Sequence, residues 1–221
     1  MRRTLVLFAA LVAAGVALAQ SGEVALGVKA GHNALCGGFA AVSVEAKYAA
    51  KTHFAIRGGV QYSTINRVAA EVRPQYYHNF EFGRLSGEVL FNYAYQNSMN
   101  SFAIGAGASL DMSPLWITLG YYHRTLKMGA DIVAEPFNIY YELGVKCLPK
   151  RERWDLNVIV TNSRIFELER HYQPSFAVDG WWYPSAKLGV LVGANYKPAG
   201  MFHISSDYYQ FYVNIGVCCR W

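Results

Sequence analysis

The stretch DYYQFYVNIGVCCRW, from Asp207 to Trp221, alternates apolar and polar side chains two residues at a time. One set of alternate positions is apolar and consists of Tyr209, Phe211, Val213, Ile215, Val217, Cys219 and Trp221. The other set is mostly polar and consists of Tyr208, Gln210, Tyr212, Asn214, Gly216, Cys218 and Arg220. Because successive side chains of a β-strand point to opposite faces, this pattern predicts one long strand with an unbroken apolar face. Such a strand is too long and too apolar for an ordinary solvated sheet edge.

A long alternating strand that ends on an aromatic residue resembles the last strand of bacterial outer-membrane β-barrels, which closes on a terminal Phe or Trp. The resemblance is to an architecture, and no subfamily motif accompanies it. It implies an antiparallel barrel in the outer membrane, with the lipid bilayer as its main partner. It also implies assembly by the barrel-assembly machinery through the C-terminal strand.

The N-terminal segment has the order of a secretory signal peptide. Arg2 and Arg3 precede an apolar run that reaches Leu18, and small residues at the end of the run suit cleavage. The apolar run is shorter than the roughly 20 residues that a membrane-spanning helix needs. We therefore expect residues 1–19 to be a cleaved signal peptide and residues 20–221 to form a single barrel domain.

The composition fits alternating strands better than apolar helices. Hydrophobic residues make up 53% of the chain, yet the mean hydropathy is only +0.11. Half-apolar strands account for both values at once, whereas a helical membrane protein would need further long apolar runs. Without Arg2 and Arg3, 18 basic residues stand against 15 acidic ones. This small excess argues against nucleic acid as a partner.

Twelve segments show this alternation, separated by turn residues. They are Glu23–His32, Phe39–Tyr48, Phe54–Ser63, Ala70–Tyr77, Leu85–Gln96, Phe102–Leu110, Leu115–Tyr121, Phe137–Cys147, Trp154–Val160, Tyr172–Trp182, Lys187–Tyr196 and Asp207–Trp221. Two of them contain prolines, Pro74 and Pro174, which cannot donate to a strand ladder. The sequence predicts an all-β, antiparallel up-and-down transmembrane β-barrel of twelve strands, with ten as the alternative if the proline segments do not pair.

Three features favour lipid, rather than a buried core, on the apolar side of these strands. The strands are close to the roughly 9–11 residues that cross a bilayer at a tilt. Aromatic residues at strand ends would form two interfacial girdles, made of Tyr48, Phe54, Tyr62, Tyr95, Tyr121, Trp154, Trp182, Tyr196, Tyr209 and Trp221. Connection lengths also alternate: Ser113-Pro114 and Pro184-Ser185 are short, whereas Arg124–Glu135 and Ser163–His171 are long and are expected to be outer loops. A soluble secreted β-protein is the alternative.

The opposite row of each strand supplies the expected lumen lining, with both charge signs about equally represented. The candidates are Glu45, Lys47, Arg57, Glu71, Arg73, Glu88, Asp111, Arg124, Glu142, Lys146, Asp155, Asp179, Lys187 and Arg220. Twelve strands lie between a barrel filled by side chains and an open porin. These charges therefore either pair across the strands and plug the interior, or line a narrow hydrophilic passage.

No pattern in the sequence requires catalysis, a cofactor or a metal. Ser205, Ser206 and Asp207 follow His203, but neighbours in one loop do not supply the geometry of a catalytic triad, and loop polarity explains them. The four cysteines, Cys36, Cys147, Cys218 and Cys219, lack the spacing of metal ligands. The expected strand order brings no two of them within disulfide distance, so we interpret them as small apolar residues.

Two functions follow from this interpretation. The first is a small pore or channel for a hydrophilic solute, with a charged, sign-balanced lumen. The second is a closed structural or interaction barrel whose outer loops contact host or envelope partners. An outer-membrane enzyme is the least favoured reading.

Overall fold

The computed structural model describes residues 21–34, 37–50, 53–148, 153–169, 173–198 and 210–221. The strands are β1 (Ser21–Asn33), β2 (Gly37–Ala49), β3 (Phe54–Ser63), β4 (Arg67–Phe80), β5 (Gly83–Gln96), β6 (Met99–Met112), β7 (Leu115–Met128), β8 (Asp131–Lys146), β9 (Trp154–Thr161), β10 (Ser163–Arg164), β11 (Glu167–Leu168), β12 (Ser175–Ser185), β13 (Leu188–Lys197) and β14 (Gln210–Arg220). The expected signal peptide lies outside the described residues. Within them, no helix is long and apolar enough to cross a membrane.

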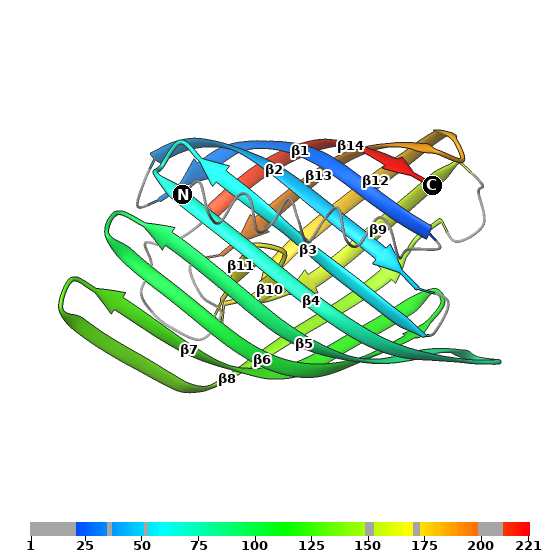
Figure 1. The fold of residues 1–221 in the computed structure, drawn as a ribbon. Helices are drawn as coiled ribbons and strands as arrows, with labels where there is room; N and C mark the ends of the chain where they lie inside the picture. Colours follow the sequence, from blue (N-terminus) through cyan, green and yellow to red (C-terminus); the bar gives the residue numbers. More distant parts are fainter. Residues whose placement is uncertain (1–20, 35–36, 51–52, 149–152, 170–172, 199–209) are drawn as a thin grey trace.

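Twelve of the described strands form one closed antiparallel barrel, which confirms the predicted fold class and strand number (Figure 1). Consecutive strands are neighbours throughout, except that β9 pairs with β12 because β10 and β11 leave the wall. The barrel closes where β1 pairs with β14, from Glu23 opposite Arg220 to Asn33 opposite Gln210. Backbone bonds of 3.1 and 3.0 Å between Gly22 and Trp221 complete this seam. We call the end of the barrel that carries Ser21 and Arg220 the terminal end, and the opposite one the far end.

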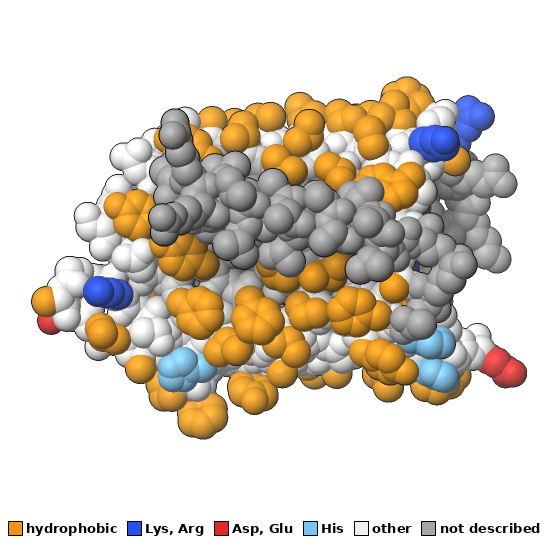
Figure 2. Space-filling model, in the orientation of Figure 1, with side chains coloured by type: hydrophobic (Ala, Val, Ile, Leu, Met, Phe, Trp, Pro, Cys, Tyr) orange, Lys and Arg blue, Asp and Glu red, His pale blue; other side chains and the backbone are white. Residues whose placement is uncertain are grey.

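The apolar rows face outward, as the alternation predicts. Ile104, Val213 and Ile215 leave 43%, 47% and 59% of their surface exposed on the barrel wall. Figure 2 shows apolar side chains spread over the visible wall, with the acidic and basic side chains at the two ends of the barrel. A wall that is apolar outside and carries its ionisable groups inside or at the ends is the arrangement of a transmembrane barrel.

The two prolines are accommodated in different ways. Pro74 lies within β4 opposite Ile56 of β3. The β4–β5 ladder is interrupted there, between the Val72–Phe91 and Gln75–Glu88 pairs, where proline has no N–H to donate. Pro174 precedes β12, which begins at Ser175 rather than at Tyr172. Both segments pair, so the ten-stranded alternative is not needed.

The structure contradicts the prediction of two long outer loops. Arg124–Glu135 is not a loop: β7 and β8 continue as a paired hairpin, with Arg124 opposite Glu135 and the turn only at Gly129. Of the second loop, Ser163–Glu169 folds into the barrel, and His171 lies outside the described residues. The turn predicted at Pro184-Ser185 falls two residues later, because β12 continues to Ser185. Connection length alone therefore did not identify the outer side.

The aromatic girdle candidates lie mainly at the exposed surface. Exposed aromatic rings among them are Phe54, Tyr62, Tyr95, Tyr121, Trp154, Trp182, Tyr196 and Trp221. Tyr48 differs, because only 7% of its surface is exposed and its ring centroid lies 5.8 Å from that of Trp221. Tyr209 lies outside the described residues.

Candidate functional site in the barrel lumen

The chain leaves the barrel wall halfway along, at Thr161 and Asn162. β9 is only eight residues long, and its pairing with β8 stops where Thr161 meets Glu142. Asn162 then satisfies the open edge of β8: its Oδ1 accepts from the Tyr141 amide at 2.7 Å, and its Nδ2 donates to the Ile139 carbonyl at 2.8 Å. The Asn162 side chain thus supplies two hydrogen bonds that a neighbouring strand would otherwise have given to β8. Buried backbone groups require such partners.

The residues that follow form a small hairpin inside the lumen, which we call the lumen hairpin (β10 and β11, Ser163–Leu168). Figure 1 shows it among the barrel strands rather than beyond their ends. Phe166, at its turn, is 1% exposed and has a left-handed φ of 69°. Leu168 belongs to a buried cluster with Leu90, Tyr122 and Tyr140 of the wall. The hairpin is therefore packed in place on apolar as well as polar groups.

Polar contacts hold the lumen hairpin from several sides of the barrel. On β4, Arg67 Nη2 donates to the Phe166 carbonyl at 2.7 Å. On β7, Arg124 Nη1 donates to the Leu168 carbonyl at 3.1 Å. On β12, Asp179 accepts from Arg164 Nη2 at 2.8 Å.

Glu167 is a buried charge of the hairpin that is held by the barrel wall. It forms an ion pair with Lys29 of β1, and Lys29 Nζ also lies 4.6 Å from the ring centroid of Tyr212. Burial by itself would raise the pKa of Glu167, but the charges of Lys29 and Arg67 outweigh burial and lower this pKa to about 2. The carboxylate therefore stays ionised at any pH near neutrality.

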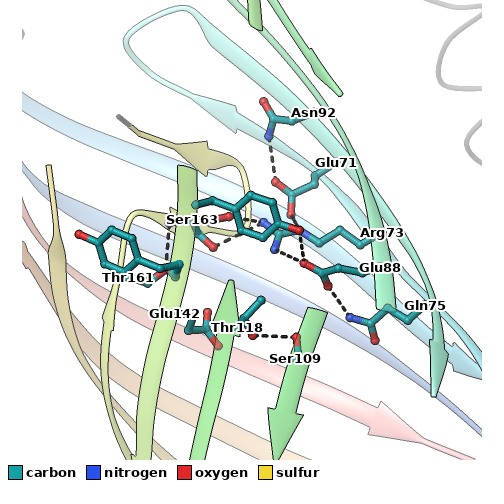
Figure 3. Close-up of polar contacts among 12 residues, drawn as sticks. Glu71, Arg73, Gln75, Glu88, Asn92, Ser109, Thr118, Glu142, Thr161 and Ser163 are labelled. Carbon is teal, nitrogen blue, oxygen red and sulfur yellow. Dashed lines mark hydrogen bonds and ion pairs between the residues drawn. The ribbon is translucent and has the colours of Figure 1, made fainter. Parts of the chain in front are cut away.

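Below the hairpin, towards the terminal end, Arg73 is the centre of a buried network (Figure 3). Its Nε donates to Glu71 at 2.6 Å, its Nη1 lies 3.4 Å from Glu88, and its Nη2 donates to the Ser163 hydroxyl at 2.7 Å. Only 3% of the Arg73 surface is exposed. Such a buried charge requires paired and hydrogen-bonded partners, and the two carboxylates and the hairpin hydroxyl supply them.

The carboxylates of this network are themselves fully engaged. Glu71 accepts from Asn92 Nδ2 at 2.9 Å, and Glu88 accepts from Gln75 Nε2 at 2.7 Å and from the Tyr140 hydroxyl at 3.0 Å. Figure 3 shows these side chains converging from neighbouring strands on the middle of the lumen. The network joins the wall to the hairpin at one level.

A cavity lies on each side of the hairpin. The far-side cavity has a volume of about 210 Å³ and is lined by Lys29, Gln61, Arg67, Arg124 and Glu167, among others. The terminal-side cavity has a volume of about 220 Å³ and reaches Ser163 of the hairpin. Most of its lining is polar: Lys47, Arg57, Arg73, Gln75, Arg84, Ser86, Glu88, Ser109, Asp111, Thr118 and Glu142. The hairpin thus separates a far-side cavity of mixed lining from a terminal-side cavity that is mostly polar.

The structure places the lumen candidates at three levels. Glu71, Arg73, Glu88 and Asp179 meet around the hairpin, as does Arg124 on its far side. Lys47, Arg57, Asp111 and Glu142 line the terminal-side cavity, with Lys146 bound to Asp111 at 3.0 Å. Glu45 shares the face of Lys47 on β2, and Asp155 and Arg220 lie near the terminal end, where Arg220 pairs with Glu23 at 2.7 Å. Lys187 does not line the lumen as predicted, because it is exposed in the turn between β12 and β13.

Sequence reasoning missed the residues that organise the interior. Lys29 and Glu23 lie on the polar face of a Gly- and Ala-rich first segment, whose charges were not considered. Arg164 and Glu167 lie in the stretch Ser163–His171, which the sequence predicts to be an outer loop, and Asn162 lies just before it. A signal was present in this stretch, because Arg164, Glu167 and Glu169 concentrate charge directly after a strand that is too short to finish its crossing.

Other chemistry-bearing residues do not assemble into a site. Among the described residues, no group of three or more His, Cys, Asp or Glu side chains could hold a metal ion. Cys147, Cys218 and Cys219 are free thiols, and Cys36 lies outside the described residues. The cluster from His203 to Asp207 also lies outside them.

Solved structures with the same architecture include two porins and an autotransporter domain. The KdgM porin in complex with disordered oligogalacturonate superposes with a TM-score of 0.57 at 11% identity, over 88% of this chain and 98% of that one. The NanC porin gives 0.56 at 11% identity, over 88% and 98%. The translocator domain of the autotransporter NalP from Neisseria meningitidis gives 0.58 at 13% identity, over 99% and 96%.

The fold is that of an outer-membrane β-barrel. At these identities the likeness concerns the fold alone. No protein-family model and no curated protein sequence matches the chain.

Proposed function

We propose that this protein is a small outer-membrane channel whose lumen is narrowed by the lumen hairpin. The observation that carries the proposal is the polar hairpin docked in mid-barrel, with a cavity of about 210 Å³ and mixed lining on one side and a mostly polar cavity of about 220 Å³ on the other. A barrel needed only as a scaffold would gain more stability from an apolar filling than from buried ion pairs. Polar groups lining a narrowed lumen suit permeation of small hydrophilic solutes.

The likeness to the KdgM and NanC porins supports the outer membrane as the location and passive permeation, without catalysis, as the activity. The outward apolar wall supports the same location. The barrel-assembly machinery, acting on β14, belongs to this proposal as the route of insertion.

Conductance in planar lipid bilayers tests the proposal. The refolded protein should produce discrete conductance steps. A variant in which residues 163–168 are replaced by a short Gly-Ser link should produce larger steps, because the obstruction is removed. As a control, shortening the β7–β8 tip around Gly129, beyond the mouth of the lumen, should leave the step size unchanged. Steps of equal size in all three proteins would show that the hairpin is not the constriction, and silence in all three would refute the channel.

A closed interaction barrel is the second candidate, and the engaged charges around Arg73 favour it. The hairpin cannot serve as its contact surface, because Ser163–Leu168 is docked inside. The β7–β8 tip would take that role, with Met128, Ile132 and Val133 exposed. This candidate predicts silence even after the hairpin is trimmed, and loss of partner binding when the β7–β8 tip is shortened.

A further inference from the structure

We infer that the terminal-side cavity is a binding site for a small anionic solute that carries a carboxylate or phosphate group, with Lys47 and Arg57 as the groups that hold the charge. The inference rests on the proposed channel function and names the solute class for it. The pairing of β2, β3 and β4 places three basic residues in one row across the wall. Lys47 of β2 lies directly opposite Arg57 of β3, which lies directly opposite Arg73 of β4.

Like charges placed directly opposite each other across strands destabilise a sheet, so such a row requires compensation. Arg73 obtains it from Glu71 and Glu88. Neither Lys47 nor Arg57 has an ion pair within the part of the chain that the structure describes, and the buried Nε of Arg57 has no hydrogen-bond partner there. On its other side Lys47 lies directly opposite Glu23 of β1, and Glu23 already pairs with Arg220 at 2.7 Å.

The acidic groups of the same cavity are already engaged. Glu88 is held by Arg73, Gln75 and Tyr140. Asp111 accepts from Lys146 at 3.0 and 3.1 Å, and Glu142 accepts from Trp116 Nε1 at 2.8 Å. The lining carries four cations, Lys47, Arg57, Arg73 and Arg84, against the carboxylates of Glu88, Asp111 and Glu142, and Asp111 is also held by Lys146. The charges of Glu45 and Glu88 act on Arg57 without forming an ion pair with it, and an anion entering the cavity would compensate the remaining positive excess.

The remaining lining suits a small oxygen-rich solute. Ser86 Oγ and Arg84 line the cavity beside Ser109 and Thr118, whose hydroxyls are 2.8 Å apart. The volume of about 220 Å³ is below the range of about 300–1,000 Å³ typical of drug-sized ligands. Phosphate or a short hydroxy-carboxylate such as gluconate fits this size class. The far-side cavity lacks the same character, because its cations Lys29, Arg67 and Arg124 each have partners on the hairpin.

Calorimetric titration of the refolded full chain in a neutral detergent tests the inference, with inorganic phosphate and gluconate as separate probes. The double variant Lys47→Gln/Arg57→Gln should bind the anion that the native protein binds at least about tenfold more weakly. Lys187→Gln removes the same kind of charge from an exposed turn at the same end and should bind like the native protein. Lys47→Arg keeps the charge and should retain most of the affinity. Circular dichroism establishes that each variant is folded.

Equal affinity in the native protein and the folded double variant would overturn the inference, as would failure of the native protein to bind either probe. If the double variant does not fold, the two single Gln variants take its place. The titration does not depend on conduction. A bilayer that stays silent while anion binding is lost in the double variant would contradict the channel but support the site. Discrete conductance steps from a protein that binds neither probe would support the channel but contradict the anion site.

Discussion

Asn162 and Glu169 are joined by two hydrogen bonds, one between backbone groups and one from the Asn162 side chain, that close the base of the lumen hairpin. The Glu169 amide donates to the Asn162 carbonyl at 2.8 Å, and Asn162 Nδ2 donates to the Glu169 carbonyl at 3.0 Å. The same Asn162 side chain satisfies Tyr141 and Ile139 on the open edge of β8. One residue therefore fixes where the chain leaves the wall and where the hairpin ends.

Replacing Asn162 by alanine should loosen this junction. The variant leaves the Tyr141 amide and the Ile139 carbonyl without their side-chain partner, and each buried unsatisfied group costs about 1–3 kcal/mol. We expect the free energy of unfolding from lipid vesicles, measured by urea titration, to fall by at least that amount. Asn157→Ala removes the same side chain from within β9, where the backbone pairs with both neighbouring strands, and should change it by less than about 0.5 kcal/mol. Equal losses of unfolding free energy in the two variants would show that the junction does not depend on Asn162 in particular.

Acid should release the lumen hairpin. Glu167 has a pKa of about 2 when docked, against an ordinary value near 4.3, so its contribution to docking is complete above about pH 4.3 and is lost as the pH falls towards 2. The charges that face it are those of Lys29, Arg67 and Lys197, and all of these stay positive over that range. Unit conductance should therefore rise between about pH 4.3 and 2.

Glu167→Gln separates this effect from the titration of other carboxylates. The variant should show a raised conductance at neutral pH and a weaker response to acid. A native conductance that is flat down to pH 2, or an unchanged response in the variant, would contradict the role given to Glu167.

The lumen wall also contains a close packing that glycine alone permits. The side chain of Tyr140 on β8 lies against Gly120 of β7 and Gly107 of β6, and a methyl group added at Gly120 would overlap its ring. Gly120→Ala should displace Tyr140 and its bond to Glu88, and lower the free energy of unfolding by about 1–3 kcal/mol. At Gly87 the nearest atom to an added methyl carbon is 4.0 Å away. Gly87→Ala should be neutral in the same urea titration, and similar losses at the two sites would refute the packing argument.

The barrel itself could be predicted from the sequence because period-two alternation is a local signal. Strands such as β5 and β14 alternate exposed and less exposed side chains along most of their length, so short segments suffice to find the pattern. The ends of the strands were harder to predict than the strands themselves. β7 and β8 run well past the expected ends. Arg124 and Glu135 resemble loop residues in the sequence, but in the structure they form an ion pair of 2.6 Å across the two strands.

The interior could not be predicted in this way, because its contacts join residues far apart in the sequence. Nothing near Lys29 indicates Glu167, and nothing near Arg73 indicates Ser163. The alternation shows which side chains face inward, but not which of them meet. The same limit explains Lys187, whose parity suits the lumen although the turn carries it outside.

The alternate apolar residues of β14 are expected to contact lipid, and the membrane location depends on this contact. Nitroxide spin labels placed singly at positions 211–217 of a cysteine-free variant reconstituted in vesicles test it directly. Collision with oxygen, which concentrates in lipid, should be high at positions 211, 213, 215 and 217 and low at 212, 214 and 216. A water-soluble nickel complex should not reach the first set. Labels at 213 and 215 that are shielded from both reagents would instead place these side chains in a protein core, and the barrel would not be a membrane protein.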